Sequence, residues 1–497
     1  MEIPKIYNTY FVALVATIGG MLFGFDISSM SAIIGTDQYN DFFNTPAGIR
    51  QGAIGSALAA GSVVGSLIAG PISNWIGRRN SIGFACIWWL AGTAVQTSVN
   101  GFGMPISGRV LNGIWVGITS SQVPVYLAEI ARKEKRGALI IVQQLAIEWG
   151  ILIMYFSGYG CSFIKGPASF RTAWGVQFVP ALFLIAGFPF LPESTRWLAK
   201  KDRADEAIQI LARIQAGGDT NNPFVVAGWE EITMTLQAER SALPGWKKFV
   251  YNGMWKRTLA GFTVQMWQQN AGANYVVYIF SMAGLSGNLN LVASGVQYAL
   301  FIVFTTIMFF YVDKVGRRPL LVFGALGMVF CHFVVGGLLS AGRIVPGGVD
   351  GNPNVPIELT GPKANTMIAF CYLLIISCGY GNAAEGNWLF NWALGLYIPP
   401  GFINIHYGLF IVFGVMRCLA AIQFYFTYPE TCGKTLEEIE ESFATGGPKP
   451  WHTRMGHSRL DALVDETKRE QLTISDVIQG KRHLGVQEST DQAQTEG

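Results

Sequence analysis

The sequence predicts an all-α membrane protein in which two similar bundles of six helices follow one another along the chain. Of its 497 residues, 51% are hydrophobic and only 13% are charged, whereas a soluble domain carries about 25% charged residues. Long apolar runs dominate instead, and about 20 apolar residues cross a hydrocarbon core of ~30 Å. This composition indicates a protein surrounded by lipid, and the net charge of +3 is too small to favour nucleic-acid binding.

A pair of loop motifs occurs twice, which indicates that the bundle is duplicated. Gly77–Arg79 is followed by Pro192–Ser194, and Gly316–Arg318 is followed by Pro429–Thr431. The copies are offset by 239 residues at the first motif and by 237 at the second. Repeated bundles of membrane helices are typical of secondary transporters.

Each half contains six apolar runs long enough to span a membrane. They cover residues 11–33, 52–75, 81–99, 106–128, 138–158 and 172–191, and then 258–283, 293–312, 319–340, 365–382, 387–403 and 408–427. The runs predict an N-terminal six-helix bundle over 1–192 and a C-terminal bundle, nominally of six spans, over 258–443.

Two hydrophilic segments complete the domain organisation. Residues 193–257 link the bundles, and helix-like stretches at 203–216 and 229–240 predict a small helical layer there. Residues 444–497 are polar, and their composition predicts a disordered tail.

Basic residues in short loops set the predicted orientation. If the N-terminus is cytosolic, the short cytosolic loops hold Arg78, Arg79, Arg132, Lys133, Lys135, Arg136, Lys314, Arg317 and Arg318. Fewer basic residues fall in the longer loops on the other side. The positive-inside preference therefore places both termini and the linking segment in the cytosol.

The sequence does not indicate an enzyme, a metal site or a cofactor. The seven cysteines are scattered without CxxC or zinc spacing. His332 and His406 are isolated, and neither a nucleophile–base spacing nor a phosphate-binding loop occurs.

Six motifs in a fixed order carry a family resemblance. They are Gly20–Asp26, Gly77–Arg79, Pro124–Ala131 with Arg136, Pro192–Leu198, Asp313–Arg318 and Pro429–Glu438. Through them the chain resembles the sugar-porter branch of the major facilitator superfamily over residues 7–443. The N-terminal residues and Gln265–Gln269 look most like those of fungal high-affinity glucose (hexose) transporters.

The resemblance implies the major facilitator fold, with an intracellular helical layer, in a fungal plasma membrane. It implies a monomeric carbohydrate:proton symporter that moves a hexose such as glucose by alternating access. Its partners are then the sugar, a proton and the lipid bilayer. Two alternatives stay open: a facilitated-diffusion uniporter, and a non-transporting sugar sensor, although such sensors carry long cytosolic tails.

The resemblance also assigns the sugar-contacting residues. Amides both donate and accept hydrogen bonds without charge, as sugar hydroxyls require. The matching positions are Gln144 in span 5, Gln268, Gln269 and Asn274 in span 7, and Asn387 and Trp388 at the start of span 11. A lone glutamine would be explained equally well as a hydrogen bond between helices.

Asp26, Arg109 and Glu148 are ionisable residues inside predicted spans, where charge is costly and indicates function. Asp26 and Arg109 lie at similar depths in spans 1 and 4, and the resemblance implies that the aspartate carries a proton and the arginine tunes it. A static ion pair is the alternative. Glu148 lies four residues after Gln144 and so on the same helical face. It is predicted to contact sugar, to hold a second proton, or to form a structural bond.

Charged residues of the cytosolic loops are predicted to gate the two bundles. This set comprises Arg78, Arg79, Glu129, Arg136, Glu193, Arg196, Asp313, Arg317, Arg318 and Glu430. Arginines at helix ends bind carboxylates of neighbouring helices, although topology anchoring alone would also explain them. Asn74 stands where the family usually has an aspartate, which predicts a weaker first-half site.

The sequence departs from the family pattern around spans 10 and 11. Residues 382–386 run directly into Asn387, where the family has roughly 25–30 further residues, including a sugar-stacking tryptophan. The apolar part of span 10, residues 366–381, offers ~24 Å of helix at 1.5 Å per residue. A splice variant or gene-model variant that transports poorly is therefore a further alternative.

Overall fold

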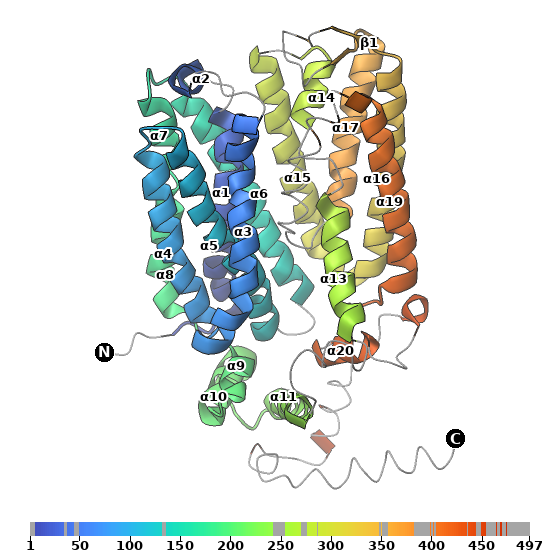
Figure 1. Ribbon diagram of the computed structural model, residues 1–497. Coiled ribbons are helices and arrows are strands. Elements are labelled where there is room, and N and C mark those ends of the chain that lie inside the picture. The colour runs from blue at the N-terminus through green and yellow to red at the C-terminus, as the bar shows by residue number, and fades with distance from the viewer. Residues whose placement is uncertain are drawn as a thin grey trace.

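The computed structural model contains two helical bundles side by side, with a layer of short helices beneath them (Figure 1). It describes residues 5–33, 37–43, 49–131, 136–241, 254–269, 276–285, 287–346, 349, 356–381, 398, 401, 404–434, 436–443, 449–453, 464, 468–469 and 474. The described part of each bundle lies in one half of the chain, as the duplicated motifs predict.

The N-terminal bundle has helices at all six predicted spans, and those at the first, second, fifth and sixth are long and apolar enough to cross a membrane. Its helices are α1 (Thr9–Ile33), α3 (Ile49–Ile76), α4 (Arg78–Thr97), α5 (Gly103–Ile130), α6 (Arg136–Cys161), α7 (Ala168–Gly175) and α8 (Phe178–Gly187). The sixth span consists of α7 and α8, continued by the 3-10 turn Phe188–Phe190. A short helix, α2 (Asp37–Phe43), lies at the end of the bundle away from the helical layer (Figure 1).

Small residues let helices of this bundle approach closely. A Cβ atom on Gly24 of α1 would lie 2.1 Å from the carbonyl oxygen of Ile147 on α6. A Cβ atom on Gly150 of α6 would lie 2.2 Å from the carbonyl oxygen of Met21. Only glycine fits at either position, and such close backbone contact replaces the hydrophobic drive that is missing between helices in lipid.

The C-terminal bundle is described less completely. Its helices are α13 (Met254–Gln269), α14 (Val276–Met282), α15 (Gly287–Val315), α16 (Arg317–Ser340), α17 (Pro362–Gly381) and α19 (Gly408–Thr427). Span 7 corresponds to α13 and α14, between which residues 270–275 are not described. A two-residue antiparallel pair, β1 (Arg343–Ile344) and β2 (Ile357–Glu358), closes the loop after α16, with Arg343 opposite Glu358.

Predicted span 11, residues 387–403, lies almost entirely outside the described residues. Among the helices that are described, seven are long and apolar enough to cross a membrane, and Pro362–Ser377 of α17 forms a shorter apolar helix. The chain is thus an integral multi-pass membrane protein, and the short span 10 agrees with the truncation expected from the sequence.

The predicted helices of the linking segment are confirmed. The layer consists of α9 (Thr195–Lys200), α10 (Ala204–Ala216) and α11 (Pro223–Ser241), with α20 (Leu436–Phe443) nearby (Figure 1). Helix α11 begins six residues before the predicted stretch at 229, because Asn222 Oδ1 accepts a hydrogen bond from Phe224 N at 3.1 Å and proline occupies the first helical position. Gly217, with φ of 63°, ends α10 in a left-handed conformation.

The described residues of the tail pack on folded helices, which the polar composition did not predict. Val464 is buried against Ala227 of α11. The ammonium of Lys468 lies 5.7 Å from the centre of the Phe224 ring. Most of 444–497 lies outside the described residues, so its disorder stays a prediction.

Candidate functional site

The first arginine site is built on the N-terminus of α4. The backbone N–H groups of Arg78 and Arg79 both donate to Oε1 of Glu193 at 3.0 Å, and that of Ser194 donates at 2.9 Å. Unpaired N–H groups at a helix start bind anions well, since the helix dipole adds to the hydrogen bonds. Gly77 has φ of 98°, and a Cβ atom there would lie 2.5 Å from Glu193 Oε2.

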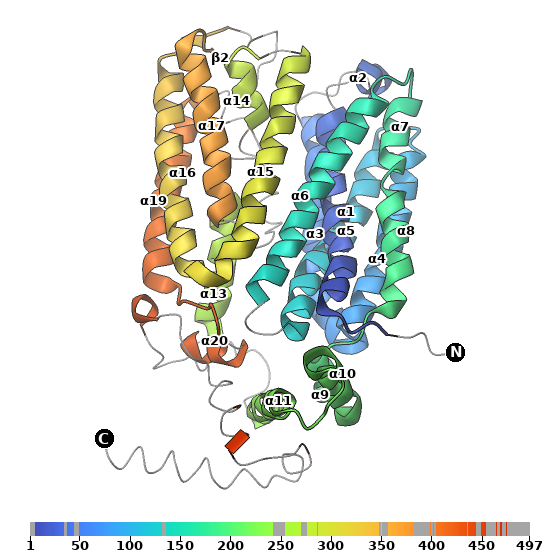
Figure 2. The same cartoon turned by 180° about the vertical axis from the view of Figure 1, so that it is seen from behind.

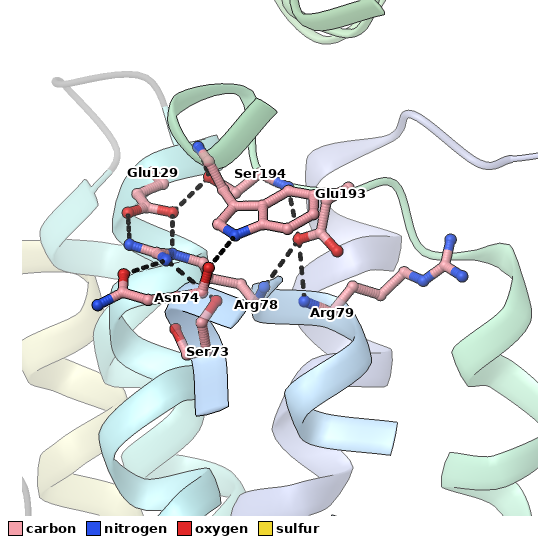
Figure 3. A network of polar contacts seen from close by, with 8 residues as sticks. Ser73, Asn74, Arg78, Arg79, Glu129, Glu193 and Ser194 are labelled. Carbon is pink, nitrogen blue, oxygen red and sulfur yellow. Dashed lines mark hydrogen bonds and ion pairs between the residues drawn. The ribbon is translucent and has the colours of Figure 1, made fainter. Parts of the chain in front are cut away.

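The side chain of Arg78 adds an ion pair to this site (Figure 3). Its Nε and Nη2 donate to the two carboxylate oxygens of Glu129, each at 3.2 Å. Ser194 Oγ donates to the same carboxylate. The loop after α3, the end of α5 and the loop after α8 therefore meet at one carboxylate–guanidinium pair.

Asn74 takes part in this site although it carries no charge. Its Oδ1 accepts from Arg78 Nη1 at 3.4 Å, and its carbonyl oxygen accepts from Trp197 Nε1 at 3.1 Å (Figure 3). A neutral amide binds a guanidinium more weakly than a carboxylate does. The expected weakening at Asn74 thus concerns one contact of a site that Glu129 still holds.

Burial raises the pKa of the Glu193 carboxyl above its usual value. The backbone N–H groups of Ser194, Arg79 and Arg78 and the charge of Arg79 act in the opposite direction. Arg79 itself stacks on Phe188, with its guanidinium carbon 5.2 Å from the ring centre, and donates to the carbonyl of Leu191.

The second arginine site repeats the helix cap at α16. Glu430 accepts from Arg317 N and Arg318 N at 3.1 Å each, and from Thr431 N and Cys432 N at 2.9 Å each. Gly316 has φ of 97°, close to that of Gly77. The two loop motifs therefore form the same structure: a glycine, a helix N-terminus and a buried glutamate.

The second arginine of each motif stacks on an aromatic ring in the same way. The guanidinium carbon of Arg318 lies 4.9 Å from the ring centre of Tyr425, and its Nη2 donates to the carbonyl of Tyr425 at 2.7 Å. Tyr425 precedes Glu430 by five residues, as Phe188 precedes Glu193. The duplication thus extends to an aromatic platform that the motif search missed; the shared spacing was the available signal.

Asp26 of α1 and Arg109 of α5 lie in contact inside the N-terminal bundle. Arg109 Nη1 is 3.3 Å from Asp26 Oδ1 and also donates to the carbonyl oxygen of Asp26 at 3.4 Å. Their side chains are 0% and 4% exposed. Ser29 Oγ donates to the Asp26 carbonyl at 2.8 Å. The two residues thus form the pair that their similar depths suggested.

Buried polar side chains surround this pair. Among the described residues, Oδ2 of Asp26 and the side-chain amide atoms of Gln96 and Asn112 have no hydrogen bond of normal geometry, although both amides lie next to the Asp26 carboxyl. Buried polar groups are normally hydrogen-bonded, to water if not to protein. These atoms are therefore placed to pair with one another or with water.

Gln144 and Glu148 of α6 form a second polar group in the middle of the molecule. Gln144 Nε2 donates to Glu148 Oε1 at 3.2 Å, and Thr305 of α15 donates to the same oxygen at 2.8 Å. Glu148 is 3% exposed, and its Oε2 has no partner among the described residues. Glu148 therefore bonds a neighbouring helix, as the structural alternative expected, and a predicted sugar residue at once.

Several predicted residues cannot be placed at this level. Gln268 and Gln269 end α13 and Arg136 begins α6, but their side chains lie outside the description, as does that of Asp313. Asn274, Asn387 and Trp388 lie outside the described residues altogether. Arg196 is half-buried on α9. The roles of these residues stay predictions.

Three comparisons bear on this geometry. The family profile described as "Sugar (and other) transporter" matches residues 12–382 and 371–443. The two matched segments meet at residues 371–382, which is the place where the sequence departs from the family pattern.

Fungal transporters resemble the chain over nearly its whole length. The high-affinity glucose transporter of Kluyveromyces lactis is 39% identical, covering 94% of this chain and 90% of that protein. High-affinity glucose transporter 1 of Candida albicans is 40% identical, with coverages of 95% and 92%. An MFS glucose transporter of Aspergillus flavus is 36% identical, with coverages of 95% and 96%.

Solved structures support the fold. The proton:xylose symporter XylE bound to 6-bromo-6-deoxy-D-glucose superimposes with a TM-score of 0.69 at 24% identity, covering 87% of this chain and 98% of that one. A double-tryptophan mutant of XylE gives 0.70 at the same identity. At this level of identity the agreement concerns the arrangement of helices.

Proposed function

Because the chain belongs to the sugar transporter family of the major facilitator superfamily, we propose that it carries a hexose, such as glucose, across a membrane by alternating access, together with a proton. Relatives named as glucose transporters, 36–40% identical over almost the entire chain, support the choice of sugar. The plasma membrane, cytosolic termini and a monomeric state belong to the same proposal.

The sugar is proposed to bind between the bundles. Gln144 lies on α6, which faces α15 of the other bundle. We assign sugar contacts to this amide and to Gln268, Gln269, Asn274, Asn387 and Trp388 on the strength of the family motifs. Amide groups match sugar hydroxyls because each provides donor and acceptor atoms at neutral charge.

We propose that Asp26 binds and releases the proton. The single observation that supports this role is the buried contact of Asp26 with Arg109 at 3.3 Å. A guanidinium at this distance stabilises the ionised carboxylate. When the bundles rearrange and the contact breaks, a desolvated carboxyl binds a proton instead. Alternation between these two environments would take up the proton on one side and release it on the other.

The arginine sites are proposed to hold the bundles closed on the side of the helical layer and to open during transport. At the first site one carboxylate, Glu129, joins Arg78 of α4 to Ser194, which caps α9 of the layer. Movement of α5 against α4 would break this ion pair. A charge-assisted contact of this kind is strong when formed, and both of its hydrogen bonds break when the two helices separate.

The test is uptake of labelled glucose by cells that lack their own hexose uptake, at two external pH values, with a C-terminal tag on the full chain. We expect uptake that increases at the lower external pH and a tag that is protected in intact cells. Saturable uptake without pH dependence would favour the uniporter. Binding of glucose without uptake would favour the sensor.

A transport-defective variant is a second candidate, favoured by the break in the family match at residues 371–382 and by the short apolar helix Pro362–Ser377. Insertion of the family's missing segment after residue 381 tests it. Restored uptake in that variant, with none in the original chain, would establish the defect.

A further inference from the structure

Among the described helices, the main contact between the two bundles is that of α6 with α15, which lie next to each other at the centre of the molecule (Figure 2). We call this contact the seam. Three layers of it are described. The rings of Tyr155 and Tyr298 are 5.8 Å apart. Thr305 binds Glu148 at 2.8 Å. Nearer the helical layer, Ile141 packs in one apolar cluster with Met308 and Val312.

The layers of the seam are evenly spaced. Glu148 and Tyr155 on α6 are seven residues apart, and so, in the opposite direction, are their partners Thr305 and Tyr298 on α15. Ile141 lies seven residues before Glu148, and its cluster on α15 comprises Met308 and Val312. A seven-residue repeat keeps two helices facing each other as their side chains interlock. The seam is therefore an antiparallel helix pair with a defined register across the boundary between bundles.

The middle layer is the polar one. In a seam of apolar and aromatic layers, a single polar layer fixes the register, because sliding by one turn of about 5.4 Å separates its partners. Here the partner of Thr305 is a carboxyl group that is 3% exposed. Leaving a buried polar group without its hydrogen-bond partner is unfavourable, so Glu148 holds α15 at one level along α6.

The same carboxylate oxygen reaches the predicted sugar residue. Glu148 Oε1 accepts from Thr305 Oγ1 and from Gln144 Nε2, so one atom joins the opposite bundle to the amide assigned to sugar binding. The other oxygen, Oε2, is buried and has no partner among the described residues. A change in the hydrogen bond from Gln144 therefore alters the strength of the bond that Glu148 accepts from Thr305.

We propose that Glu148 is a positioning residue that fixes the register of the seam and transmits sugar binding at Gln144 to the opposite bundle. The second part rests on the proposed function. When a sugar hydroxyl accepts the N–H that Gln144 now donates to Glu148, Oε1 of Glu148 loses one of its two donors. The hydrogen bond from Thr305 to that oxygen then strengthens, because two donors that share one acceptor compete. Sugar binding tightens the seam.

The register is tested by disulfide cross-linking of the full chain in membranes, after the seven native cysteines are replaced by serine. The in-register pair is Tyr155→Cys with Tyr298→Cys. The off-register pairs, displaced by one turn, are Ile151→Cys with Tyr298→Cys and Tyr155→Cys with Ile302→Cys. We expect the in-register pair to cross-link at least tenfold faster than either off-register pair.

Variants of the polar layer then separate register from packing. Thr305→Val removes the donor and keeps the shape, and Glu148→Leu removes the acceptor. Both should reduce the tenfold preference to about twofold or less. Glu148→Gln keeps an oxygen for Thr305 and should retain the preference. Thr306→Val is the matched control, since Thr306 donates to Ile302 within its own helix. An unchanged preference in both Thr305→Val and Glu148→Leu would overturn the assignment of the register.

Transmission is tested by adding glucose to the in-register pair. We expect its cross-linking to become severalfold faster with the natural polar layer and to be unaffected by glucose in Thr305→Val. Equilibrium binding of labelled glucose is measured on the same samples. If the chain binds glucose and Thr305→Val responds like the parent, transmission through Glu148 is excluded. If no glucose binds or is taken up, the proposed function fails, while the register result stands independently.

Discussion

At the first arginine site, Arg78 meets both oxygens of Glu129 at 3.2 Å, whereas at the second site the described contact of the Arg317 side chain is to the hydroxyl of Thr431 at 3.4 Å. Yet Glu193 and Glu430 cap α4 and α16 in the same way, and Arg79 and Arg318 stack on aromatic rings alike. The two sites thus share the glutamate cap and the aromatic contact, and the first site adds the pair of Arg78 with both oxygens of Glu129.

The comparison separates two functions of one motif. The glutamate cap uses Glu193 and Glu430, which follow Arg78 and Arg317 at similar distances of 115 and 113 residues, and both halves retain it. The ion pair of the first half needs Glu129, near the end of α5. The loop that would correspond to the one after α5 falls where the sequence is shortened, after residue 381. We infer that capping depends on the glutamate that both halves keep and that the pair of Arg78 with Glu129 depends on a separate motif.

The acidic residues inside the membrane also differ between the halves. Asp26 and Glu148 lie in the first half, while the described helices of the second half carry no acidic residue within the apolar part of a span, although α19 buries Arg417.

The largest expected effect concerns Asp26. Asp26→Asn should abolish accumulation of glucose against a gradient and leave exchange of labelled for unlabelled glucose partly intact, because the amide keeps the shape but cannot carry a proton. Accumulation that persists in the mutant, with acidification of the cytosol during uptake, would refute proton transfer at Asp26.

Removing the caps should affect both halves similarly. Glu193→Ala leaves three backbone donors without an acceptor, and Glu430→Ala leaves four. Each unsatisfied donor costs about 1–3 kcal/mol, so both variants should unfold at clearly lower temperature in detergent. Glu193→Gln and Glu430→Gln keep an acceptor oxygen and should be milder. Destabilisation in one half alone would contradict the equivalence of the caps.

The ion pair of the first site is tested at Glu129, and the contact of Arg317 with Thr431 serves as its comparison. Glu129→Gln loses a charge-assisted pair worth about 1.5–3 kcal/mol, so glucose uptake should slow by roughly tenfold with little change in the concentration for half-maximal uptake. Thr431→Ala removes the described side-chain partner of Arg317 and should change uptake less than twofold, since a neutral hydroxyl contact is weak. Equal effects from the two variants would show that the second site also gates through its first arginine.

The smallest expected effect strengthens the first site. Asn74→Asp places a carboxylate where the amide oxygen is now 3.4 Å from Arg78 Nη1. At a partly exposed position this adds about 0.2–1 kcal/mol, so thermal unfolding should shift upward by a few degrees at most. Asn74→Ser is the control without charge. A lower unfolding temperature for Asn74→Asp would indicate that Glu129 and the new carboxylate repel each other more than Arg78 holds them.

The sequence by itself determined the class, the span order and the motif positions. Apolar runs of membrane length predicted a helix at each of the six N-terminal spans, because a spanning segment must satisfy its backbone internally. The repeated motifs predicted two equivalent charged sites at helix ends, whereas the capping of α4 and α16 by Glu193 and Glu430 was seen only in the structure. The helix-like stretches 203–216 and 229–240 also predicted the linker helices α10 and α11.

Only the tertiary structure decided which side chains meet across helices. Composition and spacing placed Asp26 and Arg109 at similar depths, but the 3.3 Å contact depends on how α1 and α5 are rotated about their axes. Glu148 could be assigned to the face of Gln144 from the sequence. Its bond to Thr305, a residue more than a hundred positions later, depends on the register between the two bundles. Periodicity fixes the face of a helix, but the partner of that face is set by packing between helices, and packing is a property of the whole fold.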